Sequence, residues 1–305
     1  AKDLTKMSSK SAVKLLVPAR GDASESERLL FKLVAMLTGS KNALKGVGFF
    51  LGAVLLSWLD FSAALWAMAG GLLIILLVCL IYLKGDIGKS KEKVRISKLF
   101  SKTREINYLS AARFFLFGSR DVWFVVGLPI FLTEILEWSF WETGGFMALW
   151  VIGYGLVQAS APAMVKKRTH GAVETGARAA LVWGIALVVI SAAIAAAVQF
   201  DFYPKIAVLG GLAIFGLIFA VNSAVHSYLI LAYSDSDKVA LNVGFYYMAN
   251  AAGRLIGTLL SGVMYLKAGL EGCLWTSAAF VLAAVLITLA LPRKALPAEG
   301  NASVA

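Results

Sequence analysis

The sequence predicts an all-α polytopic membrane protein, and three observations carry this prediction. The 305 residues are 59% hydrophobic with a mean hydropathy of +0.78, whereas a soluble domain is about 45–50% apolar. The apolar residues form runs of the roughly 20 residues that a helix needs to cross a bilayer. Lysines and arginines interrupt several runs, although a cation at the bilayer centre costs about 2.5–3.5 kcal/mol. These cations are expected to face a wet cavity or one another, and such a cavity suits an anion.

The apolar runs predict about nine helices, of which the first is partial. The opening segment 1–17 is weakly apolar and ends at Pro18, so we expect it to be the remainder of one helix. The chain begins with Ala1 rather than methionine, and we interpret it as a product whose start is missing. The complete spans are expected at 33–57, 63–83, 106–132, 143–165, 178–199, 205–233, 240–266 and 270–291.

The polar breaks predict the domain organisation and the orientation. Lysines and arginines concentrate in 84–105, in 166–178 and after residue 292, so these segments are expected on the cytoplasmic side. The acidic and aromatic turns between them are expected outside. The domains predicted are the remainder of an N-terminal bundle at 1–83, a basic inter-bundle loop at 84–105, a six-helix C-terminal bundle at 106–292 and a cytoplasmic tail at 293–305.

A short internal echo supports two related bundles. In each, two polar residues at i and i+4 precede a G-x-x-x-G pattern, which permits close helix packing. Parallel repeats of this kind are typical of two-bundle transporters. The two segments are Lys41-x3-Lys45-x2-Gly48-x3-Gly52 and Tyr246-x3-Asn250-x2-Gly253-x3-Gly257.

The strongest candidate binding residues are cations within the spans. Lys41 and Lys45 share a helix face near the bilayer midplane, and Arg113 and Arg120 share another two turns apart. Arginine grips phosphate or carboxylate with two hydrogen bonds. The alternative for each is a structural ion pair with a neighbouring helix. A third face combines hydrogen-bonding side chains with a charge and consists of Tyr246, Tyr247, Asn250 and Arg254.

Several weaker candidates lie on other faces. Lys2, Lys6 and Lys10 form an i, i+4, i+8 stripe, of which Lys6 and Lys10 are candidate ligands, although snorkelling to the interface is the alternative. Asn222 and His226 form another i, i+4 pair, whose alternative is a structural role. Candidates for a coupling proton are Asp3, Asp121 and His226; Asp121 is expected to point about 100° away from Arg120.

Other function classes lack support in the sequence. No Walker loop, H-E-x-x-H or G-x-S-x-G motif is present, so we expect no enzyme, cofactor or metal site. The net charge of +11 lies beside apolar spans rather than on a soluble basic face, so no nucleic acid is expected. Cys79 and Cys273 occur singly in apolar runs, so we expect neither a disulfide framework nor a metal-binding cysteine cluster.

The layout resembles the major facilitator superfamily, and five segments resemble the ArsJ-type organoarsenical efflux permeases of bacterial arsenic-resistance operons. These segments are KDLTKMS at 2–8, LTGSKNALKG at 37–46, SAAR at 110–113 with GSRDVW at 118–123, LWVIGYG at 149–155 and GFYYMAN at 244–250. The resemblance implies a protein of about twelve helices in the inner membrane, of which this chain begins within the fourth. The polar faces would then lie on helices four, five, seven, ten and eleven, which line the cavity in that fold.

The resemblance also implies a substrate, 1-arseno-3-phosphoglycerate, which glyceraldehyde-3-phosphate dehydrogenase makes when arsenate replaces phosphate. Export by alternating access would confer arsenate resistance, and the partners would be this anion, the bilayer and, functionally, the dehydrogenase. The alternatives are a permease for another phosphorylated or carboxylated metabolite, an anion channel, a membrane enzyme and an inactive fragment. We expect residues 1–305 alone not to transport, because part of the cavity wall would be absent.

Overall fold

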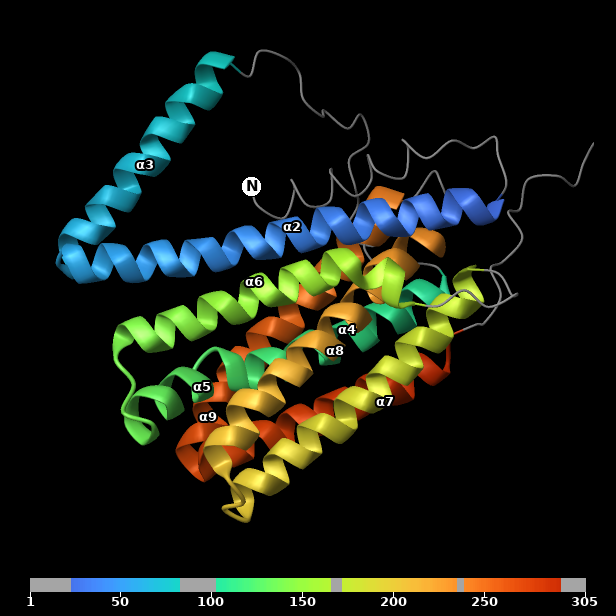
Figure 1. Ribbon diagram of the computed structural model, residues 1–305. Helices are drawn as coiled ribbons and strands as arrows, with labels where there is room; N and C mark the ends of the chain where they lie inside the picture. The colour runs from blue at the N-terminus through green and yellow to red at the C-terminus, as the bar shows by residue number, and fades with distance from the viewer. Residues whose placement is uncertain (1–22, 83–102, 166–171, 235–238, 292–305) are drawn as a thin grey trace, which may run out of the picture.

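The computed structural model describes residues 23–82, 103–165, 172–234 and 239–291, and these residues form helices and the turns between them (Figure 1). The predicted all-α class is confirmed for this part of the chain. The elements are α2 (Ala23–Trp58), α3 (Phe61–Tyr82), α4 (Arg104–Phe124), α5 (Gly127–Ile130), the π-helical turn η2 (Phe131–Ile135), α6 (Phe140–Met164), α7 (Ala172–Gln199), α8 (Pro204–Ala232) and α9 (Val239–Leu289).

Two predicted span boundaries can be compared with backbone breaks. The expected break near residue 268 is present, because Ala268 and Gly269 leave the helical region and Gly269 has φ +60°, which glycine adopts without strain. The span predicted at 106–132 is present as one membrane-length stretch, Arg104–Ile135, although its helix is irregular after Phe124. Its first part, α4, ends at Phe124, and α5 and η2 follow around Pro129, which cannot donate a helical hydrogen bond.

Six helical stretches within the described ranges are long and apolar enough to cross a membrane. They include Arg104–Ile135 as one stretch and Leu241–Leu289, which the break at Gly269 divides into two arms. The helix α2 is not among the six, because Lys41 and Lys45 interrupt its apolar run. The segment that carries the candidate lysines is therefore a long helix with a polar side.

The helices pack in a few extensive pairs. The helix α4 lies along α9, α2 lies along α6, and α7 packs against both α8 and α9. Figure 1 shows α2 running beside α6, whereas α3 diverges from the other helices. At the centre of the bundle Trp123 of α4 meets Trp150 of α6 and Phe215 of α8 edge-on, with ring centroids 5.5 and 5.3 Å apart. This aromatic cluster fixes three of the helices that carry the site.

The start of α6 is fixed by its own sequence. The Ser139 hydroxyl accepts a hydrogen bond from the Glu142 backbone N–H at 3.3 Å, and the Glu142 carboxylate accepts one from the Ser139 N–H at 2.8 Å. This reciprocal capping box satisfies donors that a helix terminus would otherwise leave unpaired. The helix therefore begins at Phe140, three residues before the predicted span.

Glycines allow the closest approaches between helices, although only one of the two predicted G-x-x-x-G segments makes such an approach. A side-chain carbon at Gly253 would overlap the backbone of Phe114, and one at Gly257 would overlap Gly118, so this G-x-x-x-G does pack tightly. The echo is wrong for α2, where an added carbon at Gly48 or Gly52 would meet nothing within 4 Å. The contact of α2 with α6 instead depends on Gly39, Gly46 and Gly155.

Replacing Gly253 with valine is expected to lower the free energy of unfolding by about 1–3 kcal/mol, because the new side chain must push α9 away from α4. Thermal unfolding in detergent measures this change. The matched control is Gly262→Val on the same helix, where an added carbon meets nothing within 4 Å. Equal unfolding temperatures for the two variants would contradict the tight contact between α4 and α9.

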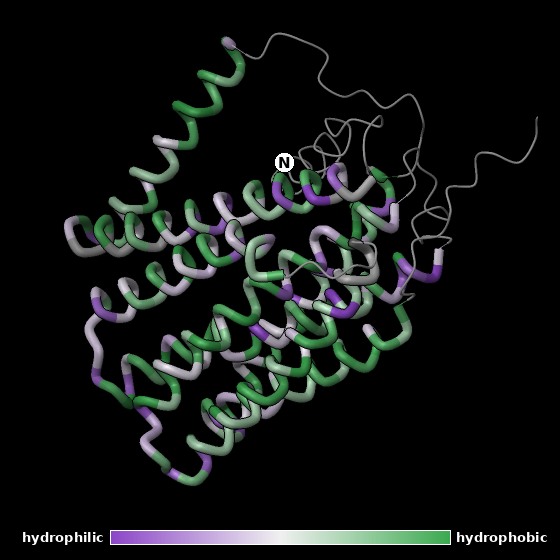
Figure 2. Tube along the Cα trace, turned by 45° about the vertical axis from the view of Figure 1, so that its right-hand side comes forward, coloured by the Kyte–Doolittle hydropathy of each residue, from purple (hydrophilic) through white to green (hydrophobic). Residues whose placement is uncertain are grey.

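The helix α3 exposes apolar side chains around its whole circumference. Only 6% of its most apolar window is buried, and its hydropathy is the highest of the six membrane-length stretches. Figure 2 shows α3 as an almost continuous hydrophobic tube that extends away from the bundle. An isolated helix with such a surface fits a hydrocarbon environment, where its backbone hydrogen bonds are satisfied internally.

Candidate anion-binding site

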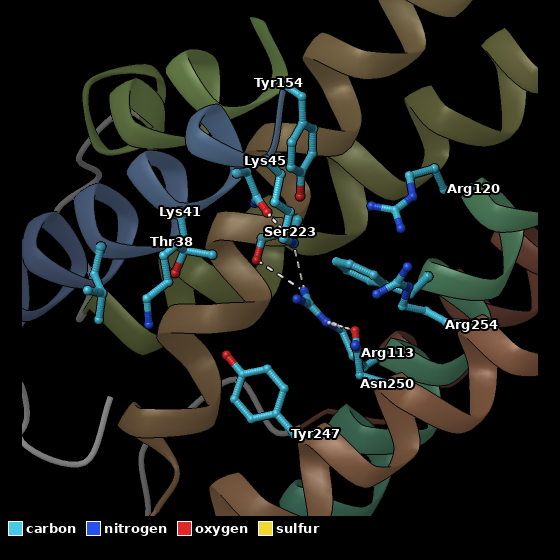
Figure 3. Close-up of a pocket in the computed structure, with 13 residues that line it drawn as sticks. Thr38, Lys41, Lys45, Arg113, Arg120, Tyr154, Ser223, Tyr247, Asn250 and Arg254 are labelled. Carbon is cyan, nitrogen blue, oxygen red and sulfur yellow. Dashed lines mark hydrogen bonds between the residues drawn. The ribbon is translucent and has the colours of Figure 1, made fainter. Parts of the chain in front are cut away.

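A cavity of about 350 Å³ lies where α2, α4, α6, α8 and α9 meet. Three of these helices contribute cations to it, and among the described residues no carboxylate lines it. Figure 3 shows these side chains converging from opposite sides of the cavity. The cationic lining consists of Lys41 and Lys45 of α2, Arg113 and Arg120 of α4, and Arg254 of α9. Five of the sequence-predicted cations therefore meet in one place, while substrate contact by each stays a prediction.

Arg113 is buried in the cavity wall and is held by neutral groups. Its Nε donates to the Asn250 side-chain oxygen at 3.1 Å, and its Nη1 donates to the carbonyl and hydroxyl oxygens of Ser223 at 3.2 and 3.1 Å. The guanidinium also lies 3.7 Å from the centroid of the Phe117 ring. These contacts orient Arg113 without cancelling its charge, so its field extends into the cavity.

A chain of hydrogen bonds joins Arg113 to Lys45 of α2. The Gln158 amide donates to the Ser223 hydroxyl at 3.1 Å, and the Asn42 amide donates to the Gln158 oxygen at 2.5 Å. Lys45 then donates to the Asn42 oxygen at 3.0 Å. Gln158 of α6 therefore links α2 to α8.

Asp121 bridges two of the arginines. Its two carboxylate oxygens accept hydrogen bonds from Nε of Arg120 and Nε of Arg254, each at 2.7 Å. Although adjacent residues on a helix are offset by about 100°, the long Arg120 side chain still reaches the Asp121 carboxylate, so the two form an ion pair within one helix. Asp121 is fully buried, whereas the Arg254 side chain is 44% exposed. One carboxylate therefore holds two cations side by side at the cavity edge.

Some predicted site residues lie elsewhere. Asn222, His226 and Tyr246 are buried but do not line the cavity, and the Tyr246 ring packs 5.1 Å from the Arg113 guanidinium. Tyr247 and Asn250 do line it. The stripe of Lys2, Lys6 and Lys10, together with Asp3, lies outside the described residues. Proton transfer by Asp121 or His226 stays a prediction.

Six lining residues were missed by the sequence interpretation, and none of them is charged. They are Leu37, Thr38, Asn42, Phe117, Tyr154 and Ser223. Ser223 follows the predicted Asn222 directly and lies one helical step away from it, so the α8 face was found with an error of one residue. A search for hydroxyl groups on the same faces as the cations would have included Thr38.

A larger cavity of about 1320 Å³ adjoins the cationic one. It extends along α6 towards Ser139, Phe140 and Trp141, at the end of the bundle that the loop charges predict to be external. The two cavities share part of their walls and therefore adjoin each other. The shared residues are Asn42, Lys45, Arg120, Tyr154 and Arg254.

Comparison with known proteins finds relatives in structure but not in sequence. No family model matches the chain, and no curated protein matches it. A crystal structure of a bacterial homologue of the iron transporter ferroportin, in its outward-facing state, is 17% identical with a TM-score of 0.61 and covers 94% of this chain and 68% of its own. A crystal structure of the human organic anion transporter MFSD10 (TETRAN) is 19% identical with a TM-score of 0.54 and covers 92% and 67%.

The structural matches establish the fold. Nearly the whole chain superposes on part of each neighbour. The chain therefore shares the helical fold of these two proteins, and it contains six stretches long and apolar enough to cross a membrane within the described residues. At this level of identity the comparison shows the fold alone, so substrate and coupling must be argued from the cavity.

Proposed function

We propose that the protein is a secondary transporter that exports a small organic anion across the bacterial inner membrane, and that this anion is 1-arseno-3-phosphoglycerate. The observation that carries the proposal is the convergence of five cations from α2, α4 and α9 on one cavity. Cations are costly at membrane depth unless they face water or a counter-charge. A cavity that gathers five of them is suited to a ligand with several negative groups.

The chemistry of the proposed substrate fits this lining. It carries a phosphate, a carboxylate and an arsenate group, and arginine binds each such group through two parallel hydrogen bonds. Hydrogen bonds to charged groups each contribute about 1.5–3 kcal/mol. The cavity volume of about 350 Å³ lies in the range of sites that enclose a small molecule.

The position of the site suits alternating access. Its lysines lie on α2, before the predicted basic loop at 84–105, and its arginines lie on α4 and α9, after that loop. In two-bundle transporters the substrate binds between the halves, which rock around it. The Lys45–Asn42–Gln158–Ser223 chain would then be an inter-bundle contact that changes during the cycle.

A metal cargo is a poorer fit to this cavity. Five cationic side chains repel a metal ion, and in the described part of the chain no three His, Cys, Asp or Glu residues are grouped to hold one. Another phosphorylated or carboxylated metabolite is the nearest rival, because the same charges would bind it. The arsenical is favoured over that rival by the sequence resemblance alone.

Expression of the full-length protein in arsenate-sensitive bacteria tests the proposal. We expect growth in arsenate to improve, and we expect this protection to disappear when glyceraldehyde-3-phosphate dehydrogenase is depleted, because the substrate is then not made. Growth in arsenite serves as the control and should not change. Protection that survives depletion of the dehydrogenase would identify a different substrate, and the absence of any protection would reject the arsenical.

A further inference from the structure

The larger cavity has a different character from the cationic one. Its charged lining residues, Lys45, Arg120, Asp121 and Arg254, all belong to the shared wall or adjoin it. The rest of its lining is mainly aromatic and aliphatic, with a few hydroxyl groups and glycines. The two adjoining cavities together are therefore amphipathic, with a cationic end and an apolar end.

The apolar end has a rigid wall on α6. Trp150 donates its ring N–H to the Leu212 carbonyl at 2.8 Å, so the polar atom of this indole is already satisfied inside the protein. Tyr154 stacks on Trp150 with centroids 5.8 Å apart, and Phe124 packs against it at 5.0 Å. Rings fixed in this way offer apolar surface to the cavity at little conformational cost.

Glycines of α2 form another part of the cavity lining. Gly48 and Gly52 of α2 line it, and a side-chain carbon added at either position would meet no atom within 4 Å. The proposed arsenical has no apolar part that would use this space. Ligand pockets commonly combine apolar walls with a few convergent polar groups. The larger cavity has this arrangement, because its mainly apolar lining includes the charged groups of Lys45, Arg120 and Arg254.

We propose that the site also accepts amphiphilic organic anions, with the anionic head on Arg120 and Arg254 and an apolar body of aromatic-ring size against the Trp150 wall. The position of the head rests on the proposed function, whereas the apolar subsite goes beyond it and names a second substrate class. The ligand could be a water-soluble organic anion or an anionic lipid, since both combine an acidic head with an apolar body.

Two probes that share a head separate the two parts of the proposal. Methylphosphonate carries the anionic group with almost no apolar body, and phenylphosphonate adds one ring. Binding to the full-length protein in zwitterionic nanodiscs is expected to be about tenfold tighter for phenylphosphonate, because the ring leaves water for an apolar wall. Benzyl alcohol, which has the ring without the charge, should not bind measurably.

Two variants test the location of the ring. Gly48→Phe should fill the space beside α2, and Met147→Ala should remove part of the apolar lining one helical turn from Trp150, so in both the tenfold preference is expected to fall towards one. Gly153→Phe on α6 is the matched control, because Gly153 lines neither cavity and an added carbon there meets nothing within 4 Å. This control should keep the preference of the unmodified protein.

The outcomes distinguish the two proposals. Binding of neither phosphonate would remove the anion site itself and with it the proposed function. Equal binding of both probes, or an unchanged preference in Gly48→Phe and Met147→Ala, would overturn the apolar subsite and leave the anion site standing. Adding phosphatidic acid to the nanodiscs separates the sources: competition with phenylphosphonate supports an amphiphilic anion from the membrane, and tight binding without competition supports a soluble one.

Discussion

Replacing Arg254 with alanine is expected to reduce export roughly thirtyfold or more, since removing one partner of a charged contact costs about 2–5 kcal/mol. Arg254 donates a hydrogen bond to Asp121 through its Nε alone, and its two Nη groups have no partner among the described residues. These groups lie on a half-exposed side chain at the wall that both cavities share. They are therefore the donors best placed to receive a carboxylate or phosphate. Initial export rates from inverted or right-side-out vesicles measure the loss.

Lys267→Ala is the matched control for this loss. Lys267 lies on the same helix, is exposed and lines neither cavity, so its removal deletes a positive charge without touching the site. Both variants should reach the membrane at the level of the unmodified protein. Export at the normal rate by Arg254→Ala would exclude this arginine from the site. Arg120→Ala is expected to behave like Arg254→Ala, because both arginines share the same carboxylate.

Hydropathy predicted most of the fold because membrane helices follow length and apolarity closely. The spans predicted at 63–83, 178–199 and 205–233 each agree with a helix to within a few residues at most ends. The helix irregularity near Pro129, which hydropathy did not predict, has a physical reason. A proline within an apolar run leaves the hydropathy intact, although it breaks the backbone ladder and separates α4 from the turns after it.

The site was predictable along each helix but not between helices. Helical spacing identified which cations share a face, and three of the predicted faces contribute residues to the cavity. Spacing carries no information on which helices are neighbours, so the link from Asn42 through Gln158 to Ser223 was missed. Helical spacing also gives only the direction in which a side chain leaves the helix. It does not show how far a long side chain can reach, and Arg120 reaches the Asp121 carboxylate next to it in the sequence.

Asp121→Asn is expected to raise the affinity for the substrate anion, whereas the two arginine substitutions are expected to weaken export. The carboxylate is the one negative group that contacts the site's arginines among the described residues, so its neutralisation raises the positive charge facing the substrate. At a separation of about 8 Å and an effective dielectric constant of about 20–40, one unit charge is worth about 1–2 kcal/mol, or roughly a tenfold lower KM. The maximal rate should fall as well, because a more tightly held anion leaves more slowly.

Initial rates measured over a range of substrate concentrations separate the two parameters. Asp201→Asn is the control, because Asp201 is an exposed carboxylate in a turn with φ 53°, a conformation that asparagine tolerates. If Asp121 served only to hold Arg120 and Arg254 in position, its loss would let the two guanidinium groups separate and KM would rise. A fall in KM together with a fall in maximal rate therefore identifies Asp121 as a counter-charge that the substrate must outcompete, and a rise in KM contradicts it.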